Sequence, residues 1–77
     1  MQKRTYAIVL EPQAEGGFVV SVPALPEIVT EGDTETEAVE MAREAIELAI
    51  AHRLSKGIEI PPGPGPHVLE VTVEAAA

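Results

Sequence analysis

The stretch 16–45 constrains the fold most, because a turn, a strand, a crossing and a helix start follow one another there with almost no spare residues. A Gly-Gly pair opens an apolar segment, residues 18–22, that has the alternation of a β-strand. Pro23 and Pro26 cannot donate a backbone hydrogen bond, so they end this strand and impose an extended crossing. A short third strand is predicted at residues 28–30.

The helix start is the clearest local signal. The hydroxyl of Thr34 is placed to accept from the amide of Glu37, and the Glu37 side chain can reach back to the Thr34 amide, which is a capping box. Apolar residues then recur on one helical stripe: Ala38, Val39, Ala42, Ala45, Ile46, Ala49 and Ile50. Lys56 and Gly57 have the pattern of a helix C-terminus. One amphipathic helix is therefore predicted between Thr34 and Gly57.

The remaining segments predict the order β-β-β-α-β. Residues 5–10 have the pattern of a first strand, and the polar residues 11–16 form its turn into the second. Residues 57–66 are a Pro/Gly-rich linker, and residues 68–73 alternate as a last strand does. We predict an α+β fold in which an antiparallel sheet is packed on one face by a single helix. This is a partial ribonuclease H-like topology, and it makes residues 1–77 one domain.

Composition narrows the classes of function. The formal net charge is −8, so the surface repels phosphate and direct nucleic-acid binding by this domain is not expected. The same charge suits a basic protein partner, or serves solubility alone. There is no cysteine, no signal-peptide pattern and no membrane-length apolar run, so we expect a cytoplasmic protein without disulfides.

No catalytic or metal-binding constellation is evident. Ser21 and Ser55 are the only serines, and neither stands in a nucleophile elbow. The two histidines lack a neighbouring ligand motif. A two-metal nuclease on a ribonuclease H-like sheet needs carboxylates inside its strands, and the first strand has none before Glu11. We therefore expect no enzyme activity, no metal and no cofactor.

The order of these motifs resembles the HicB family of antitoxins. The chain carries the family's motifs in the same order: an aromatic strand near the N-terminus, "EGGF" at the second strand, a "P-x-L-P" crossing, and "EGDT" followed by "EA" at the helix start. The residues that carry the resemblance are Gly17, Phe18, Pro23, Pro26, Gly32, Asp33, Thr34 and Ala38. The resemblance implies a non-catalytic protein that forms a complex with a small basic HicA-type toxin, which cleaves RNA, and so neutralises it.

The chain departs from the family pattern in two respects. Members commonly read "P-D-L-P-G-C" at the crossing, whereas this chain has Ala24, Glu27 and Ile28 in place of the Asp, Gly and Cys. Longer members add a DNA-binding module after the last strand, and we expect this chain to be a short form without one. Repression of its own operon is therefore not implied.

Two other functions stay open. One is a solitary structural or regulatory domain that self-associates, as a dimer or a larger oligomer, through a sheet edge or through a shoulder of the helix at Met41 and Leu48. The other is a degenerate metal nuclease, which would bind a divalent metal near Glu11 and Asp33. A short basic reading frame beside the gene would favour the antitoxin over the solitary domain.

Overall fold

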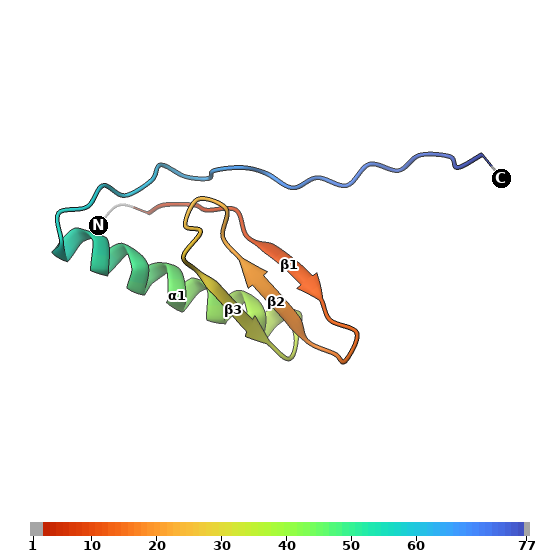
Figure 1. The fold of residues 1–77 in the computed structure, drawn as a ribbon, viewed down its shortest axis with the longest axis horizontal. Coiled ribbons are helices and arrows are strands. Elements are labelled where there is room, and N and C mark those ends of the chain that lie inside the picture. Colours follow the sequence, from red (N-terminus) through yellow and green to blue (C-terminus); the bar gives the residue numbers. More distant parts are fainter. Residues whose placement is uncertain (1–2, 77) are drawn as a thin grey trace.

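The computed structural model describes residues 3–76, in which three short strands precede one long helix (Figure 1). The elements are β1 (Val9–Pro12), β2 (Phe18–Ser21), β3 (Val29–Gly32) and α1 (Glu35–Ser55). The strands form one antiparallel sheet in the order β1-β2-β3, and α1 packs on one face of it (Figure 1). The predicted α+β class, with a single helix on one face of an antiparallel sheet, is confirmed.

The core begins at the centre of the sheet. Val20 of β2 pairs with Leu10 on one side and with Thr30 on the other. Its side chain is fully buried against Ala38 and Ala42 of α1. The small side chains of these alanines let the helix approach the sheet closely, as the predicted apolar stripe requires.

The crossing between β2 and β3 forms a second core cluster. Leu25 is fully buried and packs with Val22 and Ile28. The amide of Leu25 donates to the carbonyl of Val22, and the amide of Ile28 donates to the carbonyl of Leu25, each at 2.9 Å. Pro23 and Pro26 lie within this compact turn. The crossing is therefore tighter than the extended segment predicted from its prolines, because its carbonyls satisfy buried amides locally.

The strand boundaries differ from the predicted ones. β1 occupies residues 9–12, whereas residues 5–8 lie beside the proline-rich segment, with the Ala7 amide donating to the Pro64 carbonyl at 2.8 Å. β3 begins one residue late because Ile28 belongs to the crossing. Residues 68–73, predicted as a last strand, have no strand pairing with any other part of residues 3–76.

Both predicted helix ends are present. The Thr34 hydroxyl accepts a hydrogen bond from the Glu37 amide at 3.1 Å, and the backbone of Thr34 is extended, as at an N-cap. At the other end Gly57 adopts φ +68°, and the Ile58 amide donates to the Arg53 carbonyl at 2.8 Å. A positive φ just after the last turn is the usual way for a glycine to end a helix. Within residues 3–76, no helix is both long and apolar enough to cross a membrane.

Thr34→Ala is expected to lower the free energy of unfolding by about 1 kcal/mol, because the Glu37 amide loses its partner. Urea denaturation measures the change. Thr36→Ala is the matched control: Thr36 is exposed in the first turn, where alanine favours the helix, so no loss is expected. If Thr34→Ala left both the midpoint and the slope unchanged, Asp33 would be the effective cap.

Candidate functional site

Three motif residues meet where the helix begins to cross the sheet. A Cβ atom on Gly32 would lie 2.5 Å from the amide nitrogen of Ala38, far inside contact distance. Gly17 has φ +80°, and a Cβ atom there would lie 3.0 Å from the Gly32 carbonyl oxygen. The hairpin, the end of β3 and α1 therefore touch through backbone atoms, which only glycine permits. This arrangement favours a structural role for Gly17, Gly32 and Ala38.

The other motif residues lie around the same contact or on the crossing. Phe18 pairs with Gly32 across the sheet and packs, half-buried, on the cluster around Val20. Thr34 caps α1, and Asp33 beside it is exposed. None of these positions forms a convergent polar site. Among residues 3–76, no group of three or more histidine, aspartate or glutamate side chains is placed to hold a metal ion.

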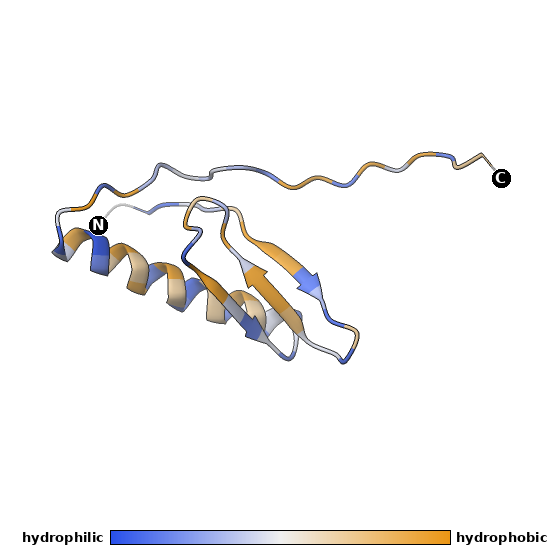
Figure 2. Ribbon diagram, in the orientation of Figure 1, coloured by the Kyte–Doolittle hydropathy of each residue, from blue (hydrophilic) through white to orange (hydrophobic). Residues whose placement is uncertain are grey.

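The face of the sheet opposite α1 carries an apolar strip between carboxylates. Because Val20 faces α1 and side chains alternate along a strand, Val19 lies on the open face. The register places Glu11 and Glu31 on either side of Val19, and both acids are exposed. In the next row, Val29 is 70% exposed. In Figure 2, β2 is hydrophobic over most of its length, while β1 and β3 turn hydrophilic near their ends.

We call this open face, made of Val9, Val19, Val29, Glu11 and Glu31, the acidic sheet face. A surface hollow lined by Val19, Val29, Thr30 and Glu31 lies on it. Apolar area framed by carboxylates suits a protein partner that is apolar at its centre and basic at its rim. The sequence pattern alone does not reveal this arrangement, because only the pairing register shows that Glu31 stands level with Glu11.

The helix shoulder predicted as a possible interface is exposed. Met41 is 38% and Leu48 72% exposed on α1. Both side chains therefore lie outside the two core clusters and are accessible to a partner. Whether they contact one stays a prediction.

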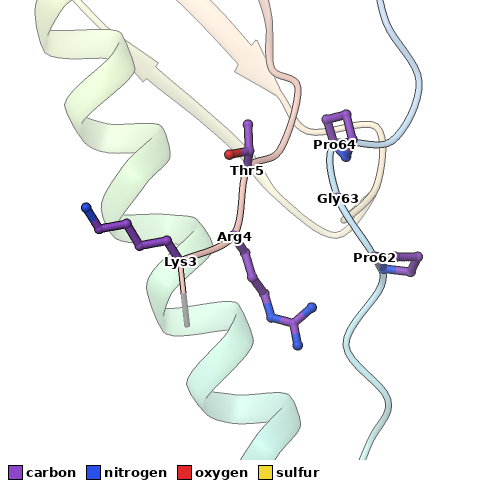
Figure 3. A pocket seen from close by; sticks show the side chains of 6 residues that line it. All are labelled: Lys3, Arg4, Thr5, Pro62, Gly63 and Pro64. Carbon is purple, nitrogen blue, oxygen red and sulfur yellow. The ribbon is translucent and has the colours of Figure 1, made fainter. Parts of the chain in front are cut away.

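A second surface hollow lies between the N-terminal residues and the proline-rich segment (Figure 3). It is lined by Lys3, Arg4, Thr5, Pro62, Gly63 and Pro64. Figure 3 shows the side chains of Lys3 and Arg4 pointing in different directions rather than converging. Since both side chains are exposed, they do not form a preorganised anion-binding site.

An ion pair that is not apparent from the sequence pattern joins the crossing to the end of α1. The guanidinium Nη2 of Arg53 lies 2.8 Å from the Oε2 of Glu27, and its Nη1 donates to the Glu59 carbonyl at 3.3 Å. The hydrogen bond from Arg53 holds the pKa of the Glu27 carboxyl below its usual value.

The Glu27–Arg53 pair predicts a pH-dependent contribution to stability. Because the folded-state pKa of Glu27 is lowered, its contribution is present above the unfolded-state pKa, about 4.3, and is lost as the pH falls through the folded-state value. Glu27→Gln is expected to destabilise by less than about 1 kcal/mol at pH 7, since the carboxylate is half-exposed to screening solvent. Urea unfolding at pH 7 and at about pH 2 is the measurement, and an equal loss at both pH values would contradict the assignment.

The sequence that forms this structure matches a known protein family. The model of the HicB-like antitoxin of bacterial toxin-antitoxin systems matches residues 6–75. The match includes the glycine contact, the crossing and the whole of α1.

Individual relatives agree with this match. Antitoxin HicB 1 of Photorhabdus laumondii is 42% identical over 74 residues, which cover 94% of this chain and 48% of that protein. Antitoxin HicB of Escherichia coli K12 is 35% identical over 77 residues, covering 94% of this chain and 55% of the relative. This chain thus spans about half the length of these two proteins. A UPF0150 protein of Archaeoglobus fulgidus is 38% identical over 66 residues, covering 86% of this chain and 93% of the relative. The chain therefore belongs to the HicB-like antitoxin family.

Proposed function

We propose that this chain is an antitoxin domain that binds a small, basic, RNA-cleaving toxin of the HicA type and neutralises it by forming a complex. The observation that carries the proposal is the family match over residues 6–75. Two of the relatives named above are antitoxins. In this proposal the domain acts in the cytoplasm, is not an enzyme and does not itself bind nucleic acid.

The charge of the chain supports a toxin-binding role in physical terms. A protein that cleaves RNA presents a basic surface to the phosphate backbone. A chain with a net charge of −8 is attracted to such a surface and offers no bond to cleave. The acidic sheet face combines that charge with apolar area, and burial of apolar area holds a complex together after encounter.

The test measures complex formation and the residual cleavage of RNA by a HicA-type toxin mixed with this protein. Glu11→Lys with Glu31→Lys is expected to weaken inhibition, because these acids frame the acidic sheet face. Glu40→Lys with Glu47→Lys is the control, since it makes the same change of charge on exposed positions of α1. Equal loss in both variants would mean that net charge alone acts, and no inhibition by the unaltered protein would refute the proposal.

A second assay addresses enzymatic activity. Pure protein with Mg²⁺ or Mn²⁺ is expected to leave labelled RNA and DNA intact. Cleavage that disappears on Glu11→Ala or Asp33→Ala would instead support the degenerate metal nuclease.

The second candidate is a solitary domain whose partner is another copy of itself. The observation that favours it is the exposure of Met41 and Leu48 on α1. If the shoulder forms the contact, Met41→Lys with Leu48→Lys abolishes any dimer seen by light scattering. A dimer that survives this change excludes the shoulder.

A further inference from the structure

The segment 68–73 has the composition of a buried strand but lies entirely in solvent. Its large apolar side chains are between 66% and 83% exposed: Val68, Leu69, Val71 and Val73. Figure 1 shows the chain running in extended form beyond the end of the sheet. We call residues 68–73 the tail strand. Exposed apolar residues at this density mark a surface that another surface covers.

The start of the tail strand is held beside the entry to β1. The Tyr6 hydroxyl donates to the Pro61 carbonyl at 2.7 Å, and the Ala7 amide donates to the Pro64 carbonyl at 2.8 Å. The two stretches therefore run side by side in the same direction. This is how a parallel strand pairing beside β1 would begin.

The register set by that bond prevents the chain's own sheet from covering the tail strand. The Ala7 amide points to the tail side at Pro64, whereas the odd-numbered residues of β1 that follow it, Val9 and Glu11, bond to β2, so this pairing does not continue as a regular ladder along β1. Moreover, the next bond in this ladder needs a backbone N–H at Pro66, which has none.

The outer edge of β1 is free to accept a strand. The sheet order leaves β1 at an edge. The Gln13 amide donates to the Gly17 carbonyl, and this pair continues the register of β1 and β2. The odd-numbered residues of β1 therefore bond to β2, and the backbone N–H and C=O groups of Leu10 face outward. Ile8 and Leu10 are only partly buried in the core beside this edge. A further strand here would complete both the backbone pairing and the burial.

We propose that the tail strand of one copy pairs with the outer edge of β1 in a second copy, and that the exchange is reciprocal. Leu69, Val71 and Val73 then lie on the side of the sheet that α1 covers, next to Leu10. Glu70 and Thr72 lie on the opposite side, where the alternation of the tail strand puts its polar residues. Two such pairings about a two-fold axis leave neither tail strand exposed.

This inference goes beyond the proposed function and does not depend on it. The exchange uses the edge of β1 and leaves the strip around Val19 uncovered, so a dimer retains two sites for a toxin. The net charge opposes dimerisation, because two chains that each carry a net charge of −8 repel each other unless salt screens them. Dimerisation is therefore expected to strengthen as salt is raised.

The first test compares two single substitutions that change charge equally. Val71→Lys is expected to raise the dimer dissociation constant at least about tenfold, because it places an ammonium group on the side buried by the exchange. Thr72→Lys, on the other side of the tail strand, is expected to leave the dimer intact. Sedimentation equilibrium in moderate salt gives the constants. Circular dichroism is expected to show the same helix content in both, since neither residue belongs to a core cluster.

The second test distinguishes exchange from pairing within one chain. The chain has no cysteine, so Glu11→Cys with Glu70→Cys, and Glu11→Cys with Thr72→Cys, each introduce one defined pair on the same side of the sheet. Mild oxidation of at least one pair is expected to give a covalent dimer. Glu11→Cys with Leu69→Cys, on opposite sides, is the control and is expected to stay unlinked.

The exchange would be overturned by a monomer at all salt and protein concentrations, by a dimer that Val71→Lys leaves as tight as before, or by a disulfide formed within single chains. Failure of both cysteine pairs to cross-link would place the second copy elsewhere than on β1 and would also refute the proposal. None of these readouts involves a toxin, so they leave the antitoxin proposal to its own assay.

Discussion

Gly32→Ala is expected to lower the free energy of unfolding by about 3 kcal/mol. The added methyl carbon would lie 2.5 Å from the amide nitrogen and 2.7 Å from the Cα of Ala38, and 2.9 Å from the carbonyl carbon of Glu37. These are backbone atoms of α1, so the contact is relieved only by moving the helix away from the sheet. Overpacking usually lowers the free energy of unfolding by about 1–3 kcal/mol, and a contact that shifts the backbone lies at the upper end of this range. Urea denaturation measures the change.

Gly57→Ala is the matched control for this prediction. A Cβ atom there has open space, but its backbone has φ +68°, so the cost is confined to the left-handed conformation and is expected to be about 1 kcal/mol. Gly32 shows no such positive φ, so any loss there is steric. A loss for Gly32→Ala no larger than that for Gly57→Ala would show that the helix moves aside at little cost.

Leu25→Ala is expected to destabilise the protein by about 3 kcal/mol, within the 2–5 kcal/mol seen when a buried leucine is truncated. Leu25 is fully buried between Val22, Ile28 and the half-buried alanines of α1. Those neighbours are small or branched and have few alternative rotamers with which to fill the cavity. The change in the midpoint of thermal or urea unfolding is the measurement.

Leu48→Ala makes the same chemical change at a position that is 72% exposed. It is expected to alter the free energy of unfolding by no more than about 0.5 kcal/mol. The contrast between the two variants tests whether the crossing is a core element. Comparable small losses in both would mean that the crossing is only loosely packed, and the second core cluster would have to be abandoned.

The helix and the hairpin were predictable because their signals are local. The Thr34 cap, the apolar stripe that begins at Ala38 and the terminating glycine at position 57 each act within about one helical turn. The Gly-Gly turn likewise places its hydrogen bonds between residues 13 and 17. The family could also be read from the sequence, since its motif residues are the ones that these local structures and the glycine contact require.

The positions of strand ends were less predictable because they depend on competing partners. Residues 5–8 have the alternation of a strand, yet the Ala7 amide bonds to Pro64, more than fifty residues away in the chain. Ile28 has the pattern of a strand residue, but the carbonyl of Leu25 captures its amide. Propensity is similar in either environment, so packing decides between them.

The α+β class, the span and apolar stripe of the helix, and membership of the HicB-like antitoxin family could thus be read from the order of the amino acids. Three features needed the folded chain: Glu11 and Glu31 stand level across Val19, Glu27 pairs with Arg53, and the tail strand runs past its own sheet. The physical reason is separation along the chain: caps and periodicity act over a few residues. Strand register, ion pairing and the exposure of a sheet edge depend instead on residues that are far apart along the chain.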